Sequence, residues 1–245
     1  MTPGAIEFVD VYKTFGTSQV LRGLSFQVSS GELCALVGAN GAGKTTAIKS
    51  LLDFCSTDAG HISIFGTPQI HADARSRLAF LPERFAPPYY LTGAEYLHTT
   101  AQLYDVPFSH DTASSMCSAL ELDLGALKRL VRTYSKGMAQ KLGLAATFLS
   151  QRELLVLDEP LSGLDPKARI LVKAQLQRLR EAGRTVFFSS HMLADVEALC
   201  DRMCLLHEGR VVFEGTIGAW LERYATRDLE TAFLRAIEPV PTDSP

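Results

Sequence analysis

One segment of the sequence, residues 38–45, limits the possible folds of this chain more than any other. It reads Gly-Ala-Asn-Gly-Ala-Gly-Lys-Thr and fits the pattern G-x-x-x-x-G-K-[ST] without a mismatch. The apolar run Leu33–Val37 precedes it and is typical of a strand buried on both faces. An apolar stripe at helical spacing follows, from Ile48 to Cys55. The sequence therefore predicts a strand, a glycine-rich loop and a helix in immediate succession.

Such a loop is suited to binding polyphosphate. Glycines let the backbone approach the ligand and turn its N–H groups inward, and the following helix adds its positive N-terminal end. We expect Lys44 to reach the β- and γ-phosphates of a nucleotide, and Thr45 to offer its hydroxyl to magnesium. A glycine-rich turn that binds nothing is disfavoured, because pattern and context agree. The predicted phosphate-binding residues are Gly38, Ala39, Asn40, Gly41, Ala42, Gly43, Lys44, Thr45 and Thr46.

A second apolar run, Leu154–Leu157, ends in two carboxylates. Asp158 is placed to supply a second anchor for magnesium, and Glu159 to polarise an attacking water as general base. Taken alone, the pair would be an acidic strand end with solvated side chains. With the phosphate loop upstream, the two segments complete one site for phosphoryl transfer.

Composition argues against a disordered chain, a collagen-like fibre and a small disulfide scaffold. With 245 residues, 47% of them hydrophobic and 21% charged, the chain is typical of one large globular domain or a core with an insert. A net charge of −3 gives no electrostatic footprint for nucleic acid. Five scattered cysteines indicate a reducing compartment rather than a disulfide framework. We also expect no signal peptide and no membrane span.

Hydrophobic periodicity predicts the other elements. Alternation over residues 24–28 predicts a strand, three stretches between residues 84 and 150 have helical spacing, and Glu208-Gly209 splits a closing hairpin. Strands that alternate with helices favour an α/β core with parallel pairing. The stripe of Leu229, Phe233 and Ile237 indicates a helix that docks on the core or on a partner chain, and the Pro- and Ser-rich end, residues 239–245, is expected to fray.

Cys200, Cys204 and His207 form the spacing C-x3-C-x2-H, which could suggest a metal site. Structural zinc requires four ligands at tighter spacing. We therefore expect buried thiols here instead of a metal site.

The remaining motifs resemble those of the ATP-binding-cassette (ABC) family, over about residues 6–215. Tyr134-Ser135-Lys136-Gly137-Met138 resembles the signature motif, which starts a helix and so offers a second anion site. Leu161–Pro166 resembles the D-loop, and Ser189-Ser190-His191 the switch with its histidine. Phe15 resembles the aromatic residue that stacks on adenine; an ordinary core phenylalanine is the alternative.

The resemblance implies an α/β fold: a P-loop NTPase core with an N-terminal antiparallel β-subdomain and an inserted helical subdomain. We expect a single ABC ATPase domain over residues 1–245. Residues 1–83 and 151–215 would form the nucleotide-binding core, 84–150 the helical insert, and 216–245 a C-terminal helix and tail.

The resemblance also implies a mechanism. Two cassettes, this chain and either an identical or a related one, would pair head to tail, with each ATP between the phosphate loop of one chain and the signature segment of its partner. Each chain would thus hold two half-sites. Glu159 and His191 would support hydrolysis; without the family context, His191 would be a satisfied histidine before a helix. Nucleotide-binding residues implied beyond the phosphate loop are Phe15, Ser135, Lys136, Gly137, Met138 and Asp165.

The chain departs from the family pattern at Glu83, Lys136 and Met138. Glu83 replaces the glutamine that contacts magnesium, and a carboxylate can still be a ligand although it adds negative charge beside the phosphates. Lys136 and Met138 stand where the consensus has glycine and glutamine. Lys136 is either an exposed surface charge or an additional phosphate contact in the closed dimer.

The predicted function is that of an ATPase, with ATP and magnesium, which powers a separate transmembrane permease at the inner face of the cell membrane. The combination of Pro82-Glu83 with the Tyr-Ser-Lys-Gly-Met segment resembles exporters of the drug, polysaccharide and copper-maturation branches. The alternatives are a non-transport ABC ATPase acting on nucleic acid or ribosomes, and a P-loop kinase. We expect no nucleic-acid partner, since no sustained heptads separate the phosphate loop from the signature and the chain has one cassette. The transported substrate would be chosen by the permease.

Overall fold

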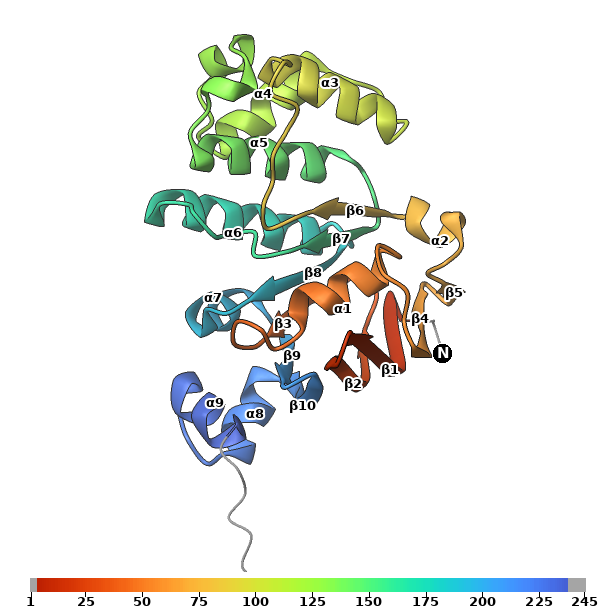
Figure 1. The fold of residues 1–245 in the computed structure, drawn as a ribbon. Helices are drawn as coiled ribbons and strands as arrows, with labels where there is room; N and C mark the ends of the chain where they lie inside the picture. Colours follow the sequence, from red (N-terminus) through yellow and green to blue (C-terminus); the bar gives the residue numbers. More distant parts are fainter. Residues whose placement is uncertain (1–3, 238–245) are drawn as a thin grey trace, which may run out of the picture. The chain divides into compact units, whose positions relative to one another are not determined.

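The computed structural model describes residues 4–237, which divide into two compact units (Figure 1). The first unit comprises residues 4–29, 33–71 and 189–237, and the second comprises residues 30–32 and 72–188. Both units combine strands with helices, as the sequence predicts for an α/β protein. The tail over residues 239–245 lies outside the described residues. Across residues 4–237, no helix is long and apolar enough to span a bilayer.

The first unit contains an antiparallel sheet with strand order β2-β1-β4-β5. Leu24, Phe26 and Val28 of this sheet are buried while their neighbours are not, so the predicted alternation is confirmed. Phe26 stacks on Phe8 of the adjacent strand with ring centroids 4.5 Å apart. The bounds are β1 Ile6–Phe15, β2 Ser18–Val28, β4 Ala59–Ile64 and β5 Thr67–Pro68.

The same unit holds three further strands, β3 (Leu33–Val37), β9 (Arg202–His207) and β10 (Arg210–Thr216). All five residues of β3 are buried, and β3 runs parallel to β9, as expected for a central strand of an α/β core. The predicted closing hairpin is confirmed: β9 and β10 pair antiparallel, and φ is +46° at Glu208 and +77° at Gly209. Two successive positive φ values are typical of the two-residue hairpin turn.

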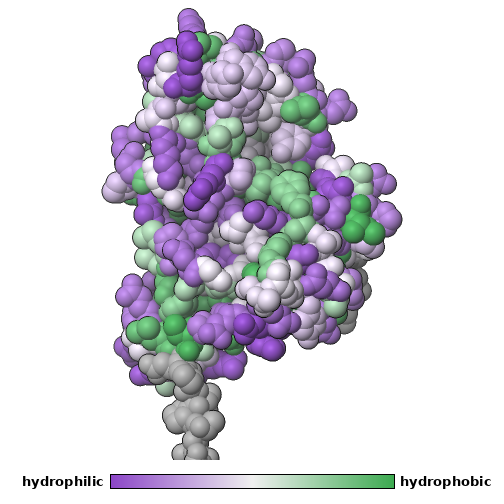
Figure 2. Space-filling view, viewed as in Figure 1, coloured by the Kyte–Doolittle hydropathy of each residue, from purple (hydrophilic) through white to green (hydrophobic). Residues whose placement is uncertain are grey.

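Four helices belong to the first unit: α1 Lys44–Leu51, α7 Leu193–Leu199, α8 Ile217–Arg223 and α9 Leu229–Ile237. Helix α1 ends before Cys55, so only the first part of the predicted apolar stripe is helical. Helix α9 packs against α7, α8 and β10, which agrees with the predicted docking of this helix on the core. Hydrophobic surface nevertheless gathers in the region of α8 and α9, at the lower left of Figure 2. On α9, Leu234 is exposed.

The second unit contains the parallel strands β6 (Leu78–Leu81) and β7 (Leu154–Leu157) and most of β8 (Thr185–Ser190), up to residue 188, with β7 in the middle. Leu81 pairs with Leu157, and Leu157 with Phe188, so the strands end at the same level. Helices α2 (Ala72–Ser76) and α6 (Pro166–Glu181) flank these strands in sequence, and Gly183 follows the end of α6 with φ +84°, a conformation that favours glycine.

Between β6 and β7 the second unit is helical. The helices are α3 Gly93–Leu103, α4 His110–Ala119 and α5 Lys136–Leu149, with two short 3-10 turns over Leu124–Lys128 and Val131–Thr133. Helices α3 and α4 both pack against α5. Apolar residues at helical spacing, among them Leu97, Cys117 and Leu142, are buried between these helices.

Candidate active site

The glycine-rich loop connects β3 to α1 inside the first unit. Lys44, the first residue of α1, is buried, and its Nζ donates to the carbonyl oxygen of Gly38 at 2.7 Å and to that of Ala39 at 3.3 Å. The side chain of Lys44 is thus hydrogen-bonded back to the start of the loop that precedes its helix. Asn40, Gly41 and Thr45 are exposed. The loop therefore presents backbone and the side chains of Asn40 and Thr45 to solvent, while the Lys44 ammonium group is hydrogen-bonded to the loop.

Two loop glycines are required by close contacts. A Cβ on Gly38 would lie 2.4 Å from the carbonyl oxygen of Leu206, and one on Gly43 would lie 3.2 Å from that of Val20. Gly43 caps α1 with φ +110°, a conformation that favours glycine, and leaves the first turn of the helix without a capping side chain. A Cβ on Gly41, by contrast, would meet no atom within 4 Å. The loop is thus tightly packed at Gly38 and Gly43 and open at Gly41, as expected of a loop that binds phosphate.

Phe15 lies at the end of β1 in the first unit. Its side chain is 50% exposed, so the alternative of a core phenylalanine is wrong. The Lys13 ammonium lies over the ring, 5.2 Å from its centroid. A half-exposed aromatic ring at a strand end is a surface on which a planar base could stack.

His191 follows β8 and precedes α7. Its side chain is exposed, and the N–H group of Met192 is taken by the Ser190 hydroxyl at 3.0 Å. The turn before α7 is thus held by Ser190, and the N-cap residue Met192 caps the helix without a side-chain hydrogen bond.

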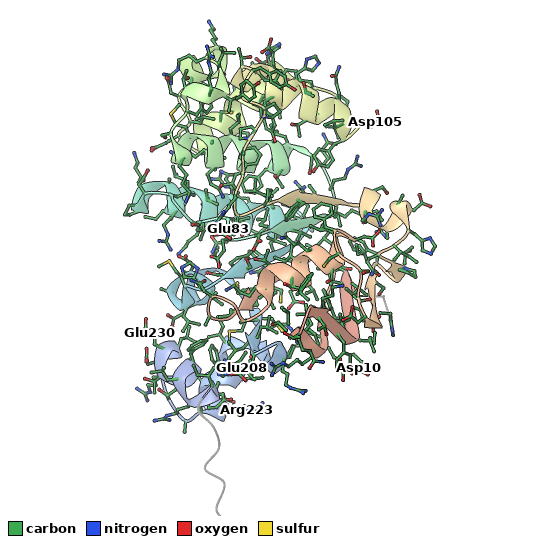
Figure 3. The ribbon with its side chains drawn as sticks, viewed as in Figure 1. Asp10, Glu83, Asp105, Glu208, Arg223 and Glu230 are labelled. Carbon is green, nitrogen blue, oxygen red and sulfur yellow. The ribbon has the colours of Figure 1, made fainter. Side chains whose placement is uncertain are left out.

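The predicted acidic strand end lies in the second unit. Asp158 and Glu159 are buried directly after β7, and the Asp158 N–H donates to the carbonyl oxygen of Leu81 on β6 at 2.8 Å. Glu83 follows the end of β6 and is exposed (Figure 3). Glu159 has φ +48°, which is uncommon for a residue other than glycine and is concentrated at functional sites. The three carboxylates therefore leave neighbouring strands at the same edge.

The signature segment forms the N-terminus of α5. Ser135 is the cap residue: its Oγ accepts the N–H of Met138 at 3.2 Å. The side chains of Ser135 and Lys136 are exposed, so this helix end faces solvent and is accessible to an anion.

The D-loop lies against the signature segment in the same unit. A Cβ on Gly137 would be 3.5 Å from the carbonyl oxygen of Gly163, and one on Gly163 would be 3.0 Å from Lys136 Cε. Lys136 is thus a surface residue whose stem covers Gly163; a phosphate contact of Lys136 stays a prediction. Asp165 caps α6 by accepting the Ala168 N–H at 2.9 Å, and this hydrogen bond lowers the pKa of its carboxyl.

Two residues that the sequence pattern does not single out also hold the site. Gln140, buried on α5, donates from Nε2 to the carbonyl oxygen of Pro160 at 3.0 Å, which ties the signature helix to the segment after Glu159. Lys13 lies beside Phe15 and is almost fully buried. Only its position two residues before Phe15 could have indicated a role.

Metal-ligating clusters are absent from the described residues: none of them groups three or more His, Cys, Asp or Glu side chains around a common point. Cys200 and Cys204 are buried free thiols, as predicted, and burial raises the pKa of Cys204.

Comparison with known proteins identifies the chain's relatives. The family model described as ABC transporter matches residues 21–162. An uncharacterized ABC transporter ATP-binding protein of Nostoc sp. is 36% identical over 229 residues, covering 88% of this chain and 68% of the relative. The Nod factor export ATP-binding protein I of Burkholderia lata is 36% identical over 231 residues, covering 91% of this chain and 74% of the relative.

Solved structures share the fold. The ATP-binding subunit of an ABC transporter superposes with a TM-score of 0.84 at 30% identity, covering 96% of this chain and all of that one. An ATP-binding cassette whose structure is described as a dimeric post-hydrolysis state bound to ADP and Pi has a TM-score of 0.78 at 20% identity, over 86% of this chain and 98% of that one. The predicted fold class is thereby confirmed, and the chain belongs to the ABC transporter family as an ATP-binding subunit with the ABC ATPase fold.

Proposed function

We propose that this chain binds and hydrolyses ATP as one half of a cassette dimer and powers export by a separate transmembrane permease. The phosphate loop carries the proposal. It combines a buried Lys44, a Gly38 at which a Cβ would meet the Leu206 carbonyl oxygen at 2.4 Å, a Gly43 with φ +110°, and an open backbone at Gly41. These features suit a triphosphate and have no evident use in a loop that binds nothing.

In this proposal the first unit binds the nucleotide. Lys44 exchanges the carbonyl oxygens of Gly38 and Ala39 for phosphate oxygens, which are stronger acceptors because they are charged. Residues Gly38–Thr46 cradle the phosphates, and Phe15 stacks on the base.

The residues present suit magnesium. Asp158, in the second unit, is a buried carboxylate at a strand end, and Thr45, in the first unit, is exposed with its hydroxyl. Each supplies the kind of oxygen that magnesium prefers. Glu83 would add a third oxygen ligand. When bound, the ion would neutralise charge on the phosphates.

Hydrolysis is assigned to Glu159 and His191. Glu159 would accept a proton from the attacking water, and burial of the residue limits the space in which its carboxylate can move. His191, exposed after β8, would hydrogen-bond the γ-phosphate.

The second anion site would act on the partner chain's nucleotide. Ser135, Lys136, Gly137 and Met138 stand at the exposed N-terminus of α5, with the D-loop residue Asp165 capping the next helix. One chain holds one phosphate loop and one signature, so two chains would enclose two ATP molecules. The dimeric cassette with ADP and Pi supports this arrangement.

Export is the finer part of the proposal. It is supported by the name of the Burkholderia lata relative and by the Glu83 and signature variants that the sequence shares with exporters. The chain would act at the inner face of the cell membrane, where the permease selects the substrate.

A Glu159→Gln substitution tests the proposal. The amide keeps the size of the side chain but cannot take a proton, so ATP turnover should fall by about a hundredfold or more while ATP binding persists. Light scattering after gel filtration should then show an ATP-dependent dimer and a monomer with ADP.

Lys44→Ala serves as the matched control, since it should lose nucleotide binding and with it any ATP-dependent dimer. A Glu159→Gln protein that stays monomeric with ATP and releases inorganic phosphate at the normal rate would overturn the assignment. Transfer of labelled phosphate to an acceptor, in place of its release, would instead indicate a kinase.

A further inference from the structure

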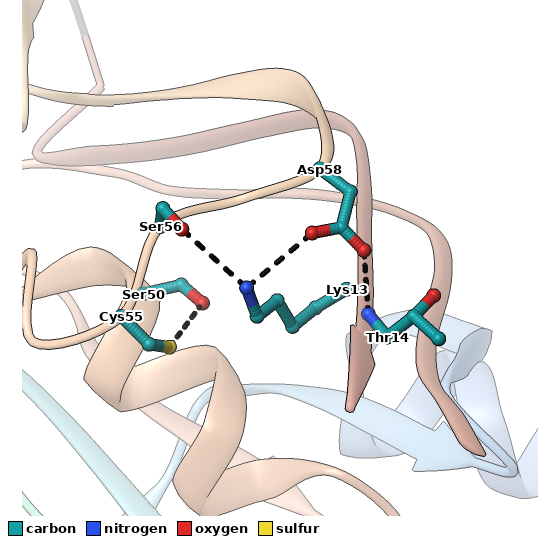
Figure 4. Close-up of polar contacts among 6 residues, drawn as sticks. All are labelled: Lys13, Thr14, Ser50, Cys55, Ser56 and Asp58. Carbon is teal, nitrogen blue, oxygen red and sulfur yellow. Dashed lines mark hydrogen bonds and ion pairs between the residues drawn. The ribbon is translucent and has the colours of Figure 1, made fainter. Parts of the chain in front are cut away.

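A buried lysine lies next to the base-stacking candidate Phe15. The Lys13 side chain is only 11% exposed, and its Nζ lies 3.3 Å from Asp58 Oδ1 and 3.5 Å from Ser56 Oγ (Figure 4). The same ammonium lies over the Phe15 ring at 5.2 Å from the centroid. A lysine is rarely buried unless it is paired with an acidic group, and here Asp58 provides the counter-ion of Lys13.

Asp58 holds the strand as well as the lysine. Its Oδ2 accepts the N–H of Thr14 at 2.6 Å, and its own N–H donates to the carbonyl oxygen of Tyr12 at 2.8 Å. The bond from Thr14 is the main reason why the pKa of the Asp58 carboxyl is lowered, with Lys13 contributing. Asp58 therefore binds the backbone on both sides of Lys13, through its carboxylate at Thr14 and through its main-chain N–H at Tyr12.

The cluster also connects Phe15 to the helix after the phosphate loop. Ser56 and Asp58 lie in the segment that follows α1, and this segment is held to α1 by the Phe54 N–H on the Lys49 carbonyl oxygen at 2.8 Å. The Ser50 hydroxyl and the Cys55 thiol lie 3.3 Å apart (Figure 4). The strand that carries Phe15 is thus connected to helix α1, which follows the phosphate loop, within the first unit.

We infer that Lys13, held by Asp58, is a positioning residue for the nucleotide base. The ammonium covers one face of the Phe15 ring and holds it by a cation–π contact, so the remaining exposed face is presented to a purine. A ring at a strand end would otherwise sample several rotamers, and ordering it beforehand lowers the entropy cost of stacking. This inference rests on the proposed function, since it requires that Phe15 stacks on the base.

The test compares ATP with inorganic tripolyphosphate, which has the phosphates but no base. Lys13→Met keeps the apolar stem and removes the charge. In the full chain it should weaken ATP binding by about threefold to tenfold, measured by calorimetry, and leave tripolyphosphate binding unchanged. Lys49→Met, at an exposed lysine in the last turn of α1, is the matched control and should change neither affinity.

A double-mutant cycle shows whether Lys13 acts through Phe15. After Phe15→Ala, Lys13→Met should cause little further loss of ATP affinity, and Lys13→Arg should restore part of the wild-type affinity. Asp58→Asn, which keeps an acceptor for Thr14 but removes the counter-ion, should resemble Lys13→Met and carries the test if Lys13→Met does not fold.

Equal losses for ATP and tripolyphosphate, additive effects with Phe15→Ala, or no loss at all would each overturn the inference. Failure of the proposed function has a different signature: the wild-type chain itself would then bind no ATP.

Discussion

Gly38 shows how a single residue is determined by its neighbours. A Cβ at this position would lie 2.4 Å from the main-chain oxygen of Leu206, which is held in β9 and cannot swing away as a side chain would. Chemistry alone explains why glycine suits a phosphate loop. Packing explains why no larger residue fits at this particular one, because the strand next to the loop occupies the space.

Gly38→Ala is therefore expected to shift the loop or β9. We expect a loss of about 2 kcal/mol in unfolding free energy together with weaker ATP binding, measured by urea unfolding and calorimetry. Gly218→Ala in α8 is the matched control, since a Cβ there meets nothing within 4 Å. That change should be neutral or stabilise by about 0.5–1 kcal/mol. Equal behaviour of the two variants would show that the contact with Leu206 is not restrictive.

The two ends of helix α5 are stabilised by different partners. Ser135 caps its N-terminus from the adjacent residue. At the other end, the Arg184 guanidinium donates to the carbonyl oxygens of Phe148 and Arg152, each at 2.7 Å. Burial lowers the pKa of Arg184 to about 10, so the group still carries its charge at neutral pH. A cation at this end also suits the helix dipole.

Arg184→Met should destabilise the chain by about 1–3 kcal/mol, because it leaves these carbonyl oxygens without their donors. The measurement is the change in the midpoint of thermal or urea unfolding. Arg178→Met, at an exposed arginine on α6, should stay within about 0.5 kcal/mol of the wild type. If both substitutions cost the same, the C-terminal end of α5 does not depend on the guanidinium.

At the scale of the whole molecule, several carboxyl groups respond to pH in the same direction. Each has a pKa below its ordinary value of 3.8 for Asp or 4.5 for Glu, chiefly because it accepts a hydrogen bond from a nearby backbone or side-chain donor. These groups are Asp58, Glu95, Glu153, Asp165 and Asp228. They belong to both units, so acid should affect the entire chain.

A lowered folded-state pKa adds stability that is fully present above the ordinary pKa and is lost as pH falls through the lowered value. We expect the denaturant concentration at the midpoint of unfolding to decrease when the pH is lowered below about 4. Between about pH 5 and 7 these carboxyl groups should not lower that midpoint. Denaturant unfolding at stepped pH provides the measurement, and Asp228→Asn should flatten part of the acid limb. A midpoint unchanged down to about pH 2 would contradict the prediction.

Features that depend on neighbours in sequence could be predicted from the sequence. The fully buried β3, the closing hairpin at Glu208-Gly209 and the end of α6 at Gly183 follow from local periodicity and from backbone conformations that favour glycine. The exact end of α1 before Cys55 could not be predicted, because an apolar stripe continues past the point where the backbone leaves the helix.

By itself, the sequence determined the strand, loop and helix of the phosphate site and the acidic end of β7, since these need only the right residue types in the right order. The tertiary structure alone decided that Phe15 is exposed, that Lys13 is buried against Asp58, and that Gln140 binds the Pro160 carbonyl oxygen. Asp58 and Pro160 lie far from Lys13 and Gln140 in the sequence, and the exposure of Phe15 depends on how the surrounding segments pack. Local periodicity does not encode such contacts, because they form only when distant segments come together.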